Sequence, residues 1–234
     1  MSIRPLVLSL ALLAPLSSAE AQHPLVLERL DAWNKAAPGP SNDVLEAEVR
    51  RKAEGIYIDK DTCPGSPVII DSVRPATADR HAFNALVHGT IRNAWFVSTR
   101  MPGCDEVPVR YMIMQDVDNG LRTIRVNRGV SKAWESLFGD TLPSVQLAAA
   151  AALRREGVTC SGDEKTSLGI TRIASEDPDL GQEVFGIRYS GGWGEIWPIV
   201  TCDRVVEVLI RFRADGDGGA FTHIPGDETR ILPQ

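Results

Sequence analysis

The chain has 234 residues and a formal net charge of −6, with 43% hydrophobic and 24% charged residues. These shares are ordinary for a globular protein, and the length is sufficient to bury a core. The negative balance, without any Lys/Arg-rich run, excludes a typical nucleic-acid-binding protein, which needs a basic face to neutralise phosphates.

The first 21 residues have the pattern of an export signal. Arg4 supplies a short positive region, residues 6–13 an apolar one, and the small residues Ala19 and Ala21 mark two alternative cleavage sites. The apolar run is shorter than the ~20 residues that a helix needs to span a bilayer. We therefore expect a signal peptide over 1–21, a periplasmic or secreted protein, and no membrane span after cleavage.

Residues 22–128 predict a first module of two helices followed by strands. The first helix carries Trp33 and ends at Pro38-Gly39-Pro40, and the second begins near Asp43 and stops at Gly55. Strands are expected over 68–73, 83–88, 94–99, 107–115 and 122–127.

Residues 129–228 predict a second module with the same order, followed by a tail over 229–234. A helix around Trp134 is expected to break at Gly139-Asp140, and an alanine-rich helix follows over 145–156. Strands are expected over 168–173, 184–189, 194–201, 205–213 and 220–224.

The two modules share enough spacing to predict a tandem duplication. Trp95 precedes Cys104 by the same interval as Trp193 precedes Cys202. Helices followed by alternating strands indicate an α+β fold, in which helices cover one face of an antiparallel sheet. We therefore expect two tandem α+β modules, each with two helices and an antiparallel sheet.

Four cysteines in an exported chain indicate disulfides, for which three pairings are possible. The duplication favours one bond within each module, Cys63 with Cys104 and Cys160 with Cys202. Each would close a long loop and stabilise the fold by about 3–4 kcal/mol.

Trp193, Glu195 and Trp197 share one face of a predicted strand. Two tryptophans beside a carboxylate are typical of an amphipathic binding surface. The alternative is that this face packs beneath the helix of its own module.

Other polar clusters carry weaker indications. His88, Arg92 and Arg100 suggest an anion site, although a solitary surface histidine explains His88 better. The Asp-rich segments 116–120 and 215–219 begin like calcium loops but lack the glutamate at the twelfth position, so they predict hairpin turns. No spacing in the sequence indicates a metal or a cofactor.

The strand Trp193-x3-Trp197-x4-Cys202, followed by alternating apolar residues from Val206 to Phe212, resembles small secreted proteins of Gram-negative bacteria that have no assigned function. In that group a glycine often follows the cysteine, where this chain has Asp203. The resemblance implies export and carries no activity with it.

The sequence contains no catalytic constellation, such as a serine elbow or paired metal-binding histidines. We therefore expect a non-catalytic binding or envelope-assembly module whose partner is an envelope protein or a glycan. The alternative is an envelope hydrolase with a site at the seam between the modules, using His88, Glu195 or His223. A structural stress protein without a small ligand is a third possibility.

Overall fold

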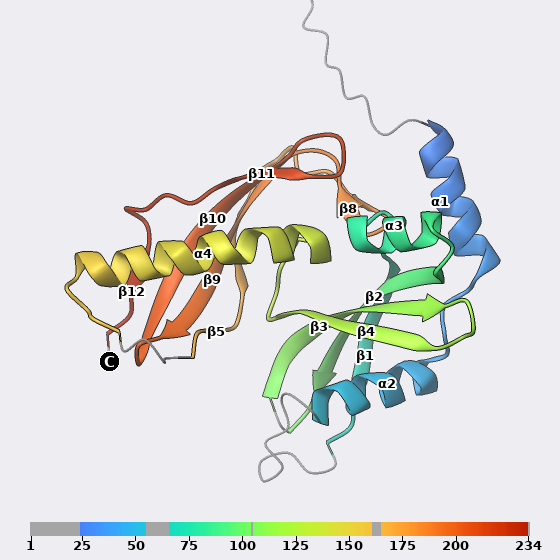
Figure 1. Cartoon of the computed structure of the whole chain (residues 1–234), viewed down its shortest axis with the longest axis horizontal. Helices are drawn as coiled ribbons and strands as arrows, with labels where there is room; N and C mark the ends of the chain where they lie inside the picture. The colour runs from blue at the N-terminus through green and yellow to red at the C-terminus, as the bar shows by residue number, and fades with distance from the viewer. Residues whose placement is uncertain (1–23, 55–65, 104, 161–164, 234) are drawn as a thin grey trace, which may run out of the picture.

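The computed structural model describes residues 24–54, 66–103, 105–160 and 165–233. Within these ranges the chain forms four helices and antiparallel sheets (Figure 1). This confirms the predicted α+β class. The predicted signal peptide, Cys63 and Cys104 lie outside the described residues.

The N-terminal half is built on a four-stranded antiparallel sheet in the order β1 (Ile69–Pro75), β2 (Ile91–Met101), β3 (Asp105–Asp116) and β4 (Leu121–Arg128). Helix α2 (Asn42–Glu54) covers one face of this sheet (Figure 1). Its stripe of Leu45, Val49 and Ala53 is buried, as predicted, and Leu45 and Val49 pack with Trp95 of β2. Helix α1 (Pro24–Ala36) lies beside α3 (Arg80–Val87), where Trp33 meets Phe83 edge-on.

The C-terminal half is built on a second antiparallel sheet, beneath α4 (Glu135–Arg155) (Figure 1). Its central pair is β9 (Gly192–Thr201) and β10 (Arg204–Ala214), and its other members are β5 (Ser167–Leu168), β6 (Arg172–Glu176), β11 (Ala220–His223) and β12 (Arg230–Ile231). The side chains of Val206, Val208, Ile210 and Phe212 are buried on the face that α4 covers, as their alternation predicts.

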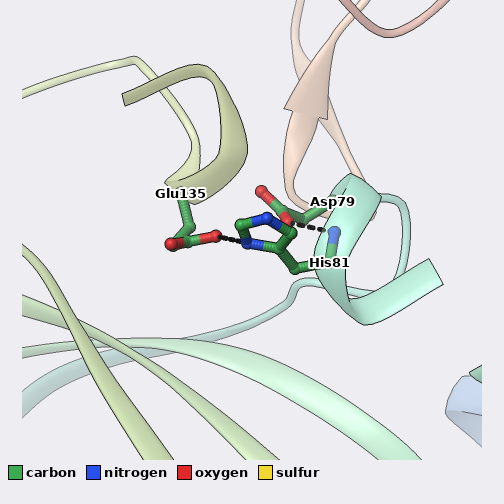
Figure 2. Close-up of side chains that lie close together, drawn as sticks. All are labelled: Asp79, His81 and Glu135. Atoms are coloured by element: carbon green, nitrogen blue, oxygen red, sulfur yellow. Dashed lines mark hydrogen bonds and ion pairs between the residues drawn. The ribbon is translucent and has the colours of Figure 1, made fainter. Parts of the chain in front are cut away.

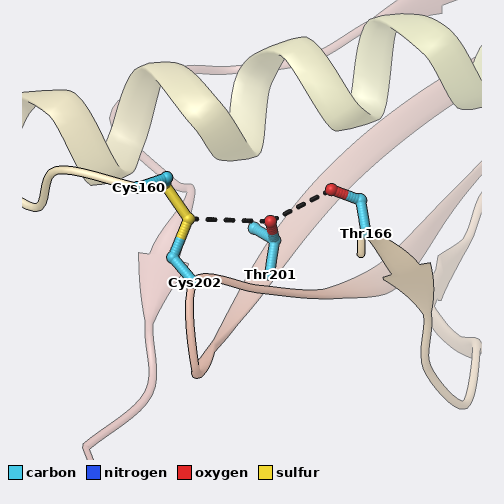
Figure 3. The surroundings of a disulfide bond; sticks show 4 residues. All are labelled: Cys160, Thr166, Thr201 and Cys202. Carbon is cyan, nitrogen blue, oxygen red and sulfur yellow. Dashed lines mark hydrogen bonds between the residues drawn. A yellow bond between two sulfur atoms is a disulfide. The ribbon is translucent and has the colours of Figure 1, made fainter. Parts of the chain in front are cut away.

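A disulfide joins Cys160, just after α4, to Cys202 in the turn between β9 and β10 (Figure 3). Cys202 and Asp203 have φ values of 54° and 52°. Two consecutive residues with positive φ are typical of the tight turns that suit twisted hairpins. The predicted pairing of Cys160 with Cys202 is therefore confirmed, and it ties the end of α4 to the tip of this hairpin.

The strand predicted over 83–88 is wrong, because residues 83–87 belong to α3 and His88 is its C-cap. Asp79 caps the helix by accepting a hydrogen bond from the His81 backbone N–H at 3.0 Å. Ala82 and Leu86, four residues apart, are both buried on one helical face. The helical period, rather than strand alternation, organises the burial of this segment.

The predicted break at Gly139-Asp140 is also wrong, because α4 runs through both residues and through Pro143. Glycine and proline within a helix cost about 1 and 3 kcal/mol relative to alanine. Leu137, Phe138 and Val145 are buried on the sheet side, and burying each is worth roughly 1.5–3 kcal/mol. Packing against the sheet therefore outweighs local propensity, and the C-terminal half has one long helix where two were expected.

The strand predicted over 184–189 is instead a hairpin of β7 (Glu183–Val184) and β8 (Ile187–Arg188). Phe185 and Gly186, at its turn, have φ values of 49° and 102°. The Phe185 carbonyl accepts a hydrogen bond from the Ala78 N–H at 3.0 Å. A Cβ on Gly186 would lie 2.8 Å from the Ala76 Cα, so only glycine permits this close approach. The hairpin thus fastens the C-terminal half to the N-terminal half.

Both Asp-rich segments form turns between strands, as predicted. In the β3–β4 turn, Asp116 accepts a hydrogen bond from Arg122 Nε at 2.7 Å. In the β10–β11 turn, Asp215 accepts from the backbone N–H groups of Asp217 and Gly219. None of the described helices is long and apolar enough to cross a membrane.

Candidate functional site

The tryptophan face of β9 is buried beneath α4. Trp193, Glu195 and Trp197 are 2%, 0% and 0% exposed. The Trp197 ring stacks on Phe138 of α4 with centroids 4.0 Å apart, and the Trp193 ring stacks on Phe212 at 5.0 Å. These side chains therefore offer no exposed binding surface, and the packing alternative describes this face.

Glu195 organises this buried face. Its Oε1 accepts hydrogen bonds from Trp193 Nε1 at 2.8 Å and from the backbone N–H groups of Lys132 and Ala133 at 2.7 and 3.2 Å. Its Oε2 accepts from Trp197 Nε1 at 2.8 Å. Residues 132 and 133 belong to the segment that connects β4 of the first sheet to α4, which covers the second sheet. Glu195 therefore holds that connection and has no contact with solvent.

Arg110 of β3, in the first sheet, binds the same 129–134 segment through hydrogen bonds. The guanidinium is buried and donates to the Ser131 carbonyl at 3.1 Å and to the Ala133 carbonyl. Burial lowers the pKa of Arg110 to about 10, and the negative charge of Glu195 opposes that shift. The two charged side chains form a polar core between the halves.

The other predicted site residues do not form a cluster with Glu195. His88 is exposed at the end of α3, and His223 is exposed on β11. Arg92, also exposed, donates to the Asn119 side-chain oxygen at 3.0 Å. Arg100 pairs with Asp71 at 2.7 Å, and eight residues of extended strand place it roughly 26 Å from Arg92. The structure does not support the predicted anion site.

A different cluster lies where α3 and α4 begin (Figure 2). His81 Nδ1 contacts Glu135 Oε2, and Asp79 lies beside them. Asp79 is wholly buried; its Oδ1 accepts from the His81 N–H, and its Oδ2 accepts from the Ser136 N–H at 2.9 Å. Burial and the Asp79 charge raise the pKa of Glu135, while the His81 contact opposes that shift.

Asp79, His81 and Glu135 are also the residue types that hold divalent metals, and one ligand atom of each lies within 4.8 Å of the others. Both Asp79 oxygens already accept backbone N–H groups, however. Two helix N-termini also point at the cluster, and their dipoles favour negative rather than positive charge. The geometry is that of two joined helix caps, so we assign no metal to it.

Beside these caps lies a cavity of about 570 Å³ that both halves of the chain build. We call it the seam cavity. It is bounded by α1, by the first turns of α3 and α4, by β8, and by the β10–β11 turn with the start of β11. Its apolar wall comprises Val26, Ala78, Phe83, Trp134, Leu137 and Ile187. Its charged lining residues are Arg80, Asp140, Asp215 and Asp217.

The β10–β11 turn closes one side of the seam cavity because of its glycines. Gly218 has a φ of 100°, and a Cβ there would lie 2.9 Å from the Ile187 side chain. The turn can therefore lie directly against β8. The sequence reveals these glycines as a turn, but their proximity to Trp134 and Arg80 depends on the tertiary fold.

Sequence reasoning missed Asp79, Glu135 and Arg80 as site residues. An aspartate directly before an apolar helical stripe is a capping pattern at Asp79, but the strand predicted over 83–88 conflicts with it. No local pattern indicated Glu135, because its partners come from the other half of the chain.

Comparisons with protein-family models, with curated proteins and with solved structures found no match to this chain.

Proposed function

We propose that this chain is an exported, non-catalytic binding module whose ligand site is the seam cavity. The observation that carries the proposal is a cavity with an apolar wall and a charged margin, built by both halves of the chain. Pockets of a few hundred cubic ångströms with this mixed lining, at the junction of two structural units, are typical small-molecule sites. The buried tryptophans of β9 do not line the cavity; Trp193 packs behind Trp134, with ring centroids 6.2 Å apart.

The walls of the seam cavity are fixed by contacts that cross between the halves. Asp79 caps α3 and also accepts from Ser136 at the start of α4. The β7–β8 hairpin is bonded to Ala78. A preformed site loses less conformational entropy on binding than a mobile one, which favours affinity.

Export and tandem duplication belong to the same proposal. The predicted signal over 1–21 and the Cys160–Cys202 disulfide both suit an oxidising compartment such as the periplasm. The long hairpins β2–β3 and β9–β10 each place a tryptophan, Trp95 or Trp193, in a buried cluster beneath a helix. This correspondence supports a duplicated hairpin, around which the helices have diverged.

Export is tested by expressing the full chain in a Gram-negative host, fractionating the cells and sequencing the N-terminus of the product. We expect a periplasmic or secreted protein that begins after Ala19 or Ala21. An intact N-terminus with all of the protein in the cytoplasm would contradict the export proposal.

Binding is tested by filling the seam cavity. Ala220→Phe places a large side chain at a lining position, whereas Ala150→Phe adds the same volume to an exposed position of α4. The oxidised proteins are incubated with a small-molecule extract of the cell envelope and gel-filtered, and the retained compounds are identified by mass spectrometry. Circular dichroism confirms that each variant is folded.

We expect the native protein and Ala150→Phe to retain the same compound, and folded Ala220→Phe to lose it. Equal retention by all three proteins would place the site elsewhere, and retention by none would remove the support for a small-molecule site.

A hydrolase at the seam is the second candidate, and the His81–Glu135 contact is the observation that favours it. A carboxylate on one imidazole nitrogen orients the other for use as a general base. His81 is about half exposed, so water can reach its ring. His81→Asn would abolish hydrolysis of envelope esters or glycosides by the purified protein if this candidate were correct, whereas a binding module would have no such activity to lose.

A further inference from the structure

We propose that the ligand of the seam cavity is a small organic cation, an amine that carries an apolar group. This inference rests on the proposed function, since it names the chemistry that the same cavity selects. It follows from the balance of charge around the cavity and from the composition of its wall.

Negative charge is in excess among the residues that line the cavity, which include Asp140, Asp215 and Asp217 but one arginine, Arg80, among the described residues. Arg80 Nη2 donates to Asp140 Oδ1 at 2.9 Å, and this hydrogen bond raises the pKa of Arg80. Among the described residues, Arg80 is the one cation that lines the cavity, and Asp140 pairs with it. Asp215 uses Oδ1 to hold its own turn, and Asp217 makes no side-chain hydrogen bond or ion pair with the described residues. Asp215 and Asp217 therefore have no cationic partner at the margin of the cavity within the part of the chain that the structure describes.

Both carboxylates lie on the β10–β11 turn, whose backbone is held in place. The Asp215 N–H donates to the Gly219 carbonyl, and the turn lies against Ile187. The carboxylates are thus presented at one edge of the cavity by a closed turn. A ligand ammonium group there would gain attraction without the loop having to reorganise.

The apolar lining of the seam cavity favours an apolar group on the same ligand. Val26, Ala78 and Phe83 line the cavity and are only partly buried, so each keeps apolar surface that a ligand can cover. Aromatic and aliphatic walls favour an apolar or aromatic group by removing its surface from water. A simple inorganic cation or a polyamine would leave this wall uncovered, and an apolar acid would meet the carboxylates with like charge.

Three probes that share one phenylethyl group and differ in their polar group test the charge preference: 2-phenylethylamine, 2-phenylethanol and 3-phenylpropionate. Binding to the ¹⁵N-labelled, oxidised full-length protein is followed by the amide shifts of Gly218, Gly219 and Ala220. We expect the amine to bind most tightly, the alcohol less tightly and the acid most weakly. Added salt should weaken only the amine, because it screens exposed charge.

Asp217→Asn removes one unpaired charge from the cavity. Asp203→Asn removes the same charge from the exposed β9–β10 turn, near the opposite end of α4, which is roughly 30 Å away along a helix of this length. For a partly exposed ion pair we expect Asp217→Asn to weaken the amine roughly two- to fivefold. The alcohol should be unaffected by it, and Asp203→Asn should leave all three probes unchanged.

Equal binding of the three probes, or tighter binding of the acid, would overturn the cation inference and leave the cavity as a binding site. If none of the probes moves these amides, or if Ala220→Phe leaves the shifts in place, the seam cavity is not the ligand site and the proposed function fails with it.

Discussion

Replacing Glu195 by glutamine tests the buried connection between the two sheets. The carboxylate accepts four N–H groups, three of them on Oε1 and one, from Trp197, on Oε2. The best orientation of an amide keeps its oxygen on the Oε1 side and turns its NH₂ group toward the Trp197 N–H. Two donors then face one another in a dry core. An unsatisfied buried donor costs about 1–3 kcal/mol, and the remaining bonds lose their charge assistance. We expect the free energy of unfolding to fall by about 3 kcal/mol.

A double-mutant cycle separates this cause from a general loss of packing. Trp197→Phe removes the opposing donor and keeps an aromatic ring against Phe138. In chemical denaturation followed by circular dichroism, we expect the double variant to be less destabilised than the sum of the single variants by about 1–2 kcal/mol. Glu207→Gln on the open face of the same sheet, which loses only a partly exposed pair with Arg172, should cost less than about 1 kcal/mol. Additive single effects at Glu195 and Trp197 would refute the reasoning.

Three further predictions concern the caps and the disulfide. Asp79→Ala removes the cap of α3 and the hydrogen bond to α4, so thermal or chemical unfolding should show that the free energy of unfolding falls by about 2–3 kcal/mol. Asp79→Asn keeps one acceptor but turns its NH₂ group toward the other buried N–H, so it should not restore the native stability. The paired change of Cys160 and Cys202 to serine opens a loop with a sequence separation of 42 and should cost about 4 kcal/mol, whereas an unchanged midpoint would show that the bond constrains little. Because burial raises the pKa of Glu135, the folded protein keeps a proton that the unfolded chain releases near pH 4.5. The stabilisation that this extra proton on Glu135 provides is complete below pH 4.5. It is lost as the pH rises through the higher pKa that Glu135 has in the folded protein. The stability difference between the native protein and Glu135→Gln should therefore change with pH in this window, and a constant difference would contradict the pKa shift.

Local patterns predicted the elements whose burial follows a simple period. The alternation from Val206 to Phe212 predicted β10, and the stripe of Leu45, Val49 and Ala53 predicted α2. The spacing of the cysteines predicted the Cys160–Cys202 bond. For the strand and the helix, neighbouring residues carry the information, since a strand repeats every two residues and a helix every 3.6. The disulfide prediction came from the matching cysteine intervals of the two expected modules.

Only the tertiary structure decided the features that depend on distant partners. The helix α4 continues through Gly139 and Pro143 because the sheet beneath it buries its apolar side. Glu195 serves the core because the residues that bond to it include a segment more than sixty positions earlier in the chain. The seam cavity is lined by residues of α1, α3, α4, β8 and β11. No local sequence pattern predicts that these elements lie next to one another. The sequence therefore determined the fold class and one disulfide, whereas long-range burial and hydrogen bonding determined where a ligand could bind.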